Sequence, residues 1–114
     1  MLAITNRLTS REDFSRTTRS SIRANTPSLV GYLLKEKELT APKVGYIVSR
    51  SVGSAVLRHR ITRQLRHATK DALGLLPEQA LAVVRAKKQP NAQQEIPHLF
   101  QELAERSKKT RVDA

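Results

Sequence analysis

The stretch from Arg50 to Lys70 constrains this chain most, because it predicts a long amphipathic helix. Gly53 permits a turn with positive φ, and Ser54 after it is a suitable N-cap. Neither Pro nor Gly follows until Gly74, so we expect a helix from Ser54 or Ala55 to about Leu73. At 1.5 Å per residue it is roughly 30 Å long. Its apolar residues recur at steps of three and four and form a stripe that must pack against a core: Leu57, Ile61, Leu65, Ala68 and Ala72.

The opposite side of this helix is basic. Its arc carries His59, Arg60, Arg63, Arg66, His67 and Lys70, and Arg58 lies at the edge of the apolar stripe. No Asp or Glu occurs from Leu39 to Lys70. A helix stabilised by its own surface charges would alternate their signs at i,i+4, whereas like charges one turn apart repel. We therefore interpret this face as a surface for a polyanion rather than as an ordinary solvated face.

The remaining patterns predict two further helices. Thr9, as N-cap, and Glu12 form a capping box that opens a helix over 10–19. Gly74 is expected to end the basic helix as a C′ glycine. A last helix is expected over 93–108, with a start as late as Ile96 or Pro97 because proline suits the first turn. Its apolar stripe is Ile96, Leu99, Phe100 and Leu103, and the tail 108–114 is expected to fray.

Short apolar segments bounded by turn residues predict strands at 22–25, 28–35, 43–50 and 80–85. The charged turn at 35–42 indicates that its two flanking strands pair as an antiparallel hairpin. The order is α–β–β–β–α–β–α. One sheet that must bury helices gives a single α+β domain over residues 1–114, a two-layer α/β sandwich.

Composition narrows the function. The chain has 114 residues and a formal net charge of +11, which points to nucleic acid or another anionic surface. It has no cysteine, so disulfides, thiolate catalysis and zinc ribbons are excluded. No apolar run has the length of a membrane span, and the segment 1–8 lacks the apolar core of a signal peptide. We expect a cytoplasmic protein without a membrane association.

Nothing in the sequence indicates catalysis by the protein itself. There is no phosphate-binding glycine loop. His59 and His67 are about 12 Å apart on an ideal helix, too far to share a metal ion. The acidic residues lie mostly near the two ends of the chain and form no evident magnesium site. We expect no catalytic residue, no metal site and no cofactor of its own.

Three alternatives remain open on these observations. A ribosomal-type or generic structured-RNA binder would use the basic helix to read RNA shape. A DNA binder would insert it in a major groove, although only Gln64 accompanies the arginines. A metal-dependent nuclease would show activity as pure protein.

The segment from Arg50 to Arg66 resembles the signature of the bacterial ribonuclease P protein subunit. That family has an arginine–asparagine–arginine core on a helix after a strand and a Val/Ile-Gly turn, and here Arg58, His59 and Arg60 stand at the core. Other positions that fit the pattern are Val52, Gly53, Ala55, Val56, Arg63 and Arg66. The chain departs from it where His59 replaces the asparagine, Ser51 a usual lysine and Thr18 a frequent second aromatic.

The resemblance implies the protein subunit of a ribonucleoprotein endonuclease that removes the 5′ leader from precursor tRNA. The RNA subunit would carry the chemistry with Mg²⁺, and the protein, a monomer outside the complex, would bind that RNA and the precursor tRNA. It also implies a left-handed crossover around the basic helix. We assign to RNA docking Arg50, Ser51, Arg58, His59, Arg60, Arg63, Arg66 and Lys70.

The leader site implied by the resemblance is a groove between the first helix and the sheet. Phe14 and Tyr32 are the aromatic residues left for it, because Phe100 belongs to an apolar stripe and Tyr46 shares a face with valines. Each of the two rings either stacks on a leader base or is buried in the core. Basic residues of the first helix would hold the leader phosphates: Arg11, Arg16 and Arg19.

Overall fold

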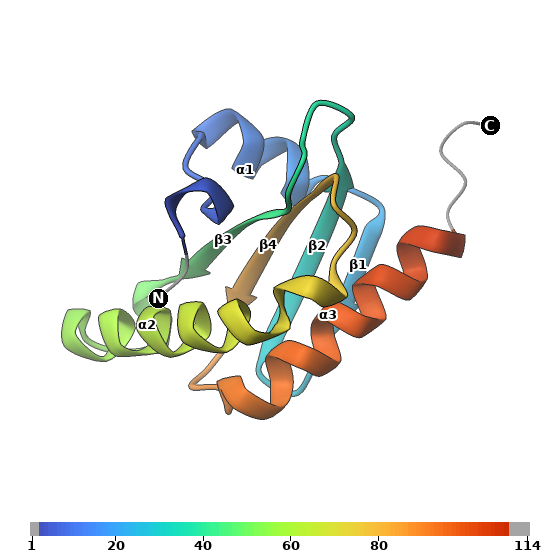
Figure 1. Ribbon diagram of the computed structural model, residues 1–114. Coiled ribbons are helices and arrows are strands. Elements are labelled where there is room, and N and C mark those ends of the chain that lie inside the picture. The colour runs from blue at the N-terminus through green and yellow to red at the C-terminus, as the bar shows by residue number, and fades with distance from the viewer. Residues whose placement is uncertain (1–2, 110–114) are drawn as a thin grey trace.

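A computed structural model, which describes residues 3–109, shows a four-stranded sheet with two long helices on one face and a short helix on the other (Figure 1). The elements are α1 (Arg11–Thr18), β1 (Ile22–Asn25), β2 (Leu29–Lys35), β3 (Lys43–Val48), α2 (Ala55–Ala72), β4 (Ala80–Ala86) and α3 (Ala92–Lys109). Single 3₁₀ turns are η1 (Ile4–Asn6), η2 (Arg50–Val52) and η3 (Leu73–Leu75). The expected element order and the α+β class are confirmed, and α1 adds cover on the second face of the sheet.

The sheet order is β1-β2-β4-β3, so the predicted hairpin between 28–35 and 43–50 is wrong. β4 lies between these strands, antiparallel to β2 and parallel to β3, and Val83 is the partner of both Tyr32 and Gly45. The physical reason is the composition of β4. Its first five residues, 80–84, are all buried, so both faces of this strand need cover. A central position gives that cover, whereas an edge position would not.

The parallel pair β3 and β4 is joined through α2, which forms a βαβ crossover. In Figure 1 the helices lie in front of the sheet and both strands run toward the lower left. If the strands are turned to point upward, β4 lies to the left of β3. The crossover is therefore left-handed, against the strong right-handed norm, as the family resemblance implied.

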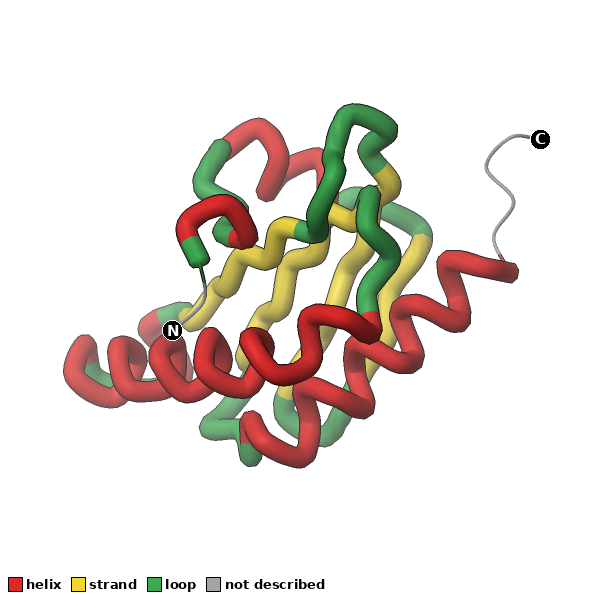
Figure 2. Tube along the Cα trace, in the orientation of Figure 1, coloured by secondary structure: helices red, strands yellow, loops and turns green. Residues whose placement is uncertain are grey.

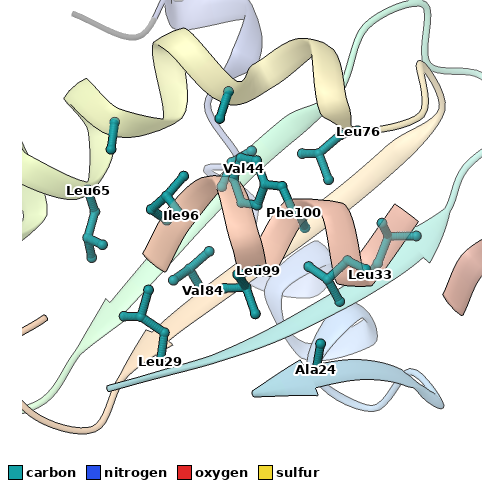
Figure 3. Packing of buried hydrophobic residues seen from close by; sticks show 14 of the residues in the cluster. Ala24, Leu29, Leu33, Val44, Leu65, Leu76, Val84, Ile96, Leu99 and Phe100 are labelled. Atoms are coloured by element: carbon teal, nitrogen blue, oxygen red, sulfur yellow. The ribbon is translucent and has the colours of Figure 1, made fainter. Parts of the chain in front are cut away.

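The main core lies between the sheet and the two long helices (Figure 3). Ile61 and Leu65 of α2 and Phe100 of α3 are fully buried there. Burial of such a side chain contributes about 1.5–3 kcal/mol. The stripes predicted for both helices are confirmed, except that Leu57 is only partly buried. Fully buried residues of this core include Leu29, Leu33, Ile61, Leu65, Ile96, Leu99, Phe100 and Leu103.

Several predicted element ends need correction. Ser10, not Thr9, caps α1, because its side chain accepts from the Asp13 amide and the helix begins one residue later. Gly74 is not a left-handed C′ residue, since α2 tightens directly into η3.

The last helix is also longer than predicted. It begins at Ala92, so Pro97 lies inside it rather than at its start. Lys108 and Lys109 are helical, and the rest of the tail predicted to fray lies outside the described residues.

Glu95 fixes the start of α3. One carboxylate oxygen, Oε1, accepts from the Thr26 hydroxyl at 2.6 Å and from the Ser28 amide at 2.8 Å. The other, Oε2, accepts from the Asn91 amide at 2.9 Å. Burial opposes ionisation of this carboxyl, but the hydrogen bonds from Thr26, Asn91 and Ser28 outweigh it and lower its pKa. The turn between β1 and β2 is thus tied to the N-terminus of α3.

Candidate RNA interface

The basic face of α2 forms one continuous exposed surface with the preceding turn η2. Ser54 caps the helix by accepting from the Leu57 amide at 3.2 Å, as predicted. Gly53 has a φ of 158°, in the region that favours glycine. The predicted docking residues that are exposed are Arg50, Ser51, His59, Arg60, Arg63 and Lys70. The first acidic residue of α2 is Asp71, so this surface carries uncompensated positive charge along most of the helix.

Arg58 and Arg66 differ from their neighbours because each is half-buried. They lie eight residues apart, with Thr62 between them, on one flank of α2. The Nε atom of each is enclosed and has no hydrogen-bond partner among the described residues. Arg66 was expected on the open arc, so the structure places it closer to the protein than predicted.

The flank of α2 that carries Arg66 contacts β3 through a short hydrogen-bond chain. The Tyr46 hydroxyl donates to Thr69 Oγ1 at 2.6 Å, and the Thr69 hydroxyl donates to the Leu65 carbonyl at 2.7 Å. Burial raises the pKa of Tyr46 to about 12, although Thr69, Arg66 and Arg7 act in the opposite direction. Tyr46 therefore stays a neutral donor and holds α2 in position on the sheet.

The other face of the sheet carries the two aromatic residues predicted for the leader. Phe14 of α1 lies directly on Gly45, where an added Cβ would clash with its ring. Tyr32 lies in the same row of the sheet, separated by Val83. Two strand spacings of about 4.8 Å each place Tyr32 roughly 10 Å from Gly45. Both rings pack on the second, smaller apolar cluster and are only partly buried, so each keeps an accessible part.

Two arginines on this face were missed by the sequence reasoning. Arg23 of β1 lies over the Tyr32 ring, with 5.5 Å between the guanidinium carbon and the ring centroid. Arg85 is the one exposed residue of β4, and its partners in the neighbouring strands are Val30 and Ile47. The alternation around Arg23 and the single charge of the apolar segment at Arg85 were readable from the sequence. Only the sheet order, however, places them beside Tyr32.

The three arginines predicted to hold leader phosphates are not equivalent. Arg11 and Arg19 are exposed at opposite ends of α1. Arg16 pairs with Asp13 at 3.1 Å and approaches Glu36 at 3.6 Å. Its charge is largely compensated, so it is less available to a phosphate than the other two.

Within residues 3–109, no group of three or more His, Cys, Asp or Glu side chains is placed to hold a metal ion. His59 and His67 are both exposed on α2. None of the helices in this part of the chain is long and apolar enough to cross a membrane.

Comparison with known proteins gives one consistent family. The family model "Ribonuclease P" matches residues 2–111. A ribonuclease P protein component of Streptomyces griseus subsp. griseus is 40% identical over 94 residues, which cover 75% of this chain and 76% of that protein. A second, from Mycolicibacterium vanbaalenii, is 39% identical over 106 residues and covers 90% of this chain and 87% of its own.

Solved structures agree with the fold. The Staphylococcus aureus RNase P protein superposes with a TM-score of 0.66 at 27% identity, over 91% of this chain and 93% of that chain. The RNase P protein from Thermotoga maritima gives a TM-score of 0.62 at 21% identity, over 90% and 92% of the two chains.

Proposed function

Because this chain belongs to the ribonuclease P protein family, we propose that it is the protein subunit of the endoribonuclease that removes the 5′ leader from precursor tRNA. The observation that carries the proposal, besides family membership, is the exposed basic face of α2. The proposed partners are the RNA subunit and precursor tRNA. The free protein would be a monomer in the cytoplasm.

The RNA subunit would dock on the basic face of α2. Phosphate contacts from Lys and Arg supply most sequence-independent affinity for nucleic acid and release bound counterions. Arg60, Arg63 and Lys70 extend into solvent and suit such contacts. Arg58 and Arg66 are half-buried on the flank of α2, so they would contact RNA groups that come close to the protein surface.

The 5′ leader would lie on the opposite face of the sheet, between α1 and β1. Tyr32 offers a ring on which an unpaired base can stack, worth about 1–3 kcal/mol per base. Arg23 already covers part of that ring, so we expect the base and the guanidinium to share it. Phosphates would be held by Arg11 and Arg19, with Arg85 nearby on β4. Such contacts position the strand without reading its sequence.

The chemistry would belong to the RNA subunit and its Mg²⁺ ions. The protein would contribute binding and positioning, with no catalytic side chain. Supporting this, the protein resembles subunits rather than free-standing nucleases, and its exposed surfaces described above are basic rather than acidic.

The experiment that tests this function is purification of the protein from its own cells followed by sequencing of the bound RNA. We expect one dominant RNA that, with Mg²⁺, cleaves precursor tRNA at the mature 5′ end. Pure protein without RNA should not cleave. A mixture of ribosomal and messenger RNAs with no such species would instead support the generic RNA binder, and cleavage by RNA-free protein would support a nuclease.

A further inference from the structure

A cleft borders the basic face of α2 on the side away from the proposed leader groove. It encloses about 740 Å³ between α2 and the loop that joins β4 to α3. Figure 2 shows this loop in green below α2. Small-molecule sites usually enclose roughly 300–1,000 Å³, so the cleft is large enough for one nucleotide. Its walls are formed by Arg63, Gln64, Arg66, His67 and residues 89–93.

Side-chain amides line both walls of the cleft. Gln64 comes from α2, and Gln89 and Gln93 come from the loop and the first turn of α3. None of the three amide groups has a hydrogen-bond partner within the described part of the chain, whereas Asn91 bonds to Gln94. Each amide offers both donors and an acceptor. That combination matches the edge of an unpaired nucleobase, which also presents donors and acceptors.

The same cleft offers positive charge for a phosphate. Arg63 and Arg66 lie on the α2 wall, and no carboxylate lines the cleft. On the other wall, the amides of Ala92 and Gln93 belong to the first turn of α3, where backbone donors have no partner within the helix. Base-recognising and phosphate-recognising groups thus converge from two elements.

We propose that this cleft binds one unpaired nucleotide, with its base against the glutamine amides and its phosphate against Arg63 and the first turn of α3. The source of the nucleotide, an unstacked residue of the RNA that docks on α2, rests on the proposed function. The ability of the cleft to take a nucleotide does not. Docking on α2 would then combine phosphate contacts along the helix with one anchored base.

The direct test is an NMR titration of the full chain with the four ribonucleoside 5′-monophosphates, and with ribose 5-phosphate as the probe that lacks a base. We expect at least one nucleotide to shift the side-chain amide signals of Gln64, Gln89 and Gln93 saturably. Ribose 5-phosphate should bind these groups roughly 5- to 150-fold more weakly, since a good amide–base pair contributes about 1–3 kcal/mol. Equal shifts from ribose 5-phosphate, or no shift of these amides by any nucleotide, would overturn the proposal.

A double variant, Gln64→Ala with Gln93→Ala, tests the same cleft without changing charge. Gln101→Ala is the matched control, because Gln101 is an exposed glutamine of α3 that does not line the cleft. The double variant should lose the nucleotide shifts and the control should keep them. Chemical probing of the RNA subunit in complex with each protein should show one unpaired nucleotide that is protected by the unsubstituted protein and by the control. The same nucleotide should stay reactive with the double variant. If the protein fails to bind that RNA at all, the proposed function fails while the nucleotide titration still decides the cleft.

Discussion

Arg60 and Arg63 lie one helical turn apart on the exposed face of α2, where neither has an ion-pair partner within residues 3–109. Their positive charge therefore faces solvent without compensation, unlike that of Arg16 on α1, which is paired with Asp13. At the scale of single residues, this difference separates the cations that can serve RNA from those that stabilise the protein. Charge alone, counted from the sequence, does not make that distinction.

Reversal of two charges on α2 should weaken RNA binding through lost phosphate contacts. For Arg60→Glu with Arg63→Glu, we expect the slope of log affinity against log salt to fall by roughly one unit per lost contact, about two in all. The measurement is a salt titration of binding to the RNA subunit. Lys108→Glu with Lys109→Glu at the end of α3 makes the same change in net charge and should leave the slope unchanged. A slope that the α2 variant does not alter would contradict the docking surface.

Gly45 is the residue on which α1 rests, because the Phe14 ring fills the space where a Cβ would be. Gly45→Ala should displace Phe14 and cost about 1–3 kcal/mol of stability, the usual range for overpacking. Denaturant unfolding measures that cost. Gly74→Ala is the control, since a Cβ there meets no atom within 4 Å. If Gly45→Ala proves as stable as the control, Phe14 is not seated as described.

At the scale of elements, α2 and α3 depend on anchors that are distant in sequence. α2 is held to β3 by Tyr46 and Thr69, and α3 is held to the turn after β1 by Glu95. The Glu95 anchor also determines where α3 begins and positions the loop that lines the nucleotide cleft. The stability of this anchor should depend on pH, because it needs an ionised carboxylate.

In the folded protein the pKa of Glu95 lies below the ordinary glutamate value of 4.5. Such a carboxylate stabilises the fold fully above its unfolded pKa, and this contribution is lost as the pH falls through the lower folded pKa. Glu95→Gln should therefore reduce the free energy of unfolding at pH 7 by about 1 kcal/mol, and the difference from the unsubstituted protein should shrink toward pH 3. The measurement is denaturant unfolding across that range.

Glu102→Gln serves as the control for the Glu95 anchor. Glu102 makes an exposed ion pair with Arg106, which contributes little. If Glu95→Gln behaves like Glu102→Gln at every pH, the anchor does not contribute as described.

The sequence was sufficient for most elements and insufficient for their arrangement. The α2 stripe was predictable because it recurs at helical spacing, and Ser54 because its cap is local. The hairpin prediction failed because β4, which is buried on both faces, takes the position between β2 and β3. That position can be recognised only when the burial of all four strands is compared. The later start that Pro97 suggested for α3 was wrong, because Glu95 anchors the first turn of this helix to Thr26 and Ser28, which are distant in the sequence.

The candidate site, like the fold, could be predicted from the sequence only in part. The residues predicted to dock RNA follow one another along η2 and α2, so the sequence could group them. Arg23 and Arg85 could not be assigned to the proposed leader groove, because their proximity to Tyr32 depends on the β1-β2-β4-β3 order. The cleft beside α2 also needs the fold, since its two walls come from separate elements.

At the scale of the whole molecule, the sheet separates two basic surfaces. α2 and α3 cover one face and α1 lies on the other (Figure 1). Tyr32 and Arg23 belong to the same face as α1. The molecule measures 43 × 27 × 25 Å, so an RNA docked on α2 and a leader strand on the opposite face would be held about one protein thickness apart. In the proposed function, the protein would thus bridge the RNA subunit and its substrate.

One crosslinking measurement tests this two-sided arrangement most directly. A photoreactive group is placed a few nucleotides 5′ of the cleavage site in precursor tRNA, and the labelled protein residues are mapped in the complex with the RNA subunit. We predict labelling of α1 between Phe14 and Arg19, together with Tyr32 and Arg23. Labelling of α2 or α3 in place of these residues would contradict the assignment of the leader to the groove beside α1.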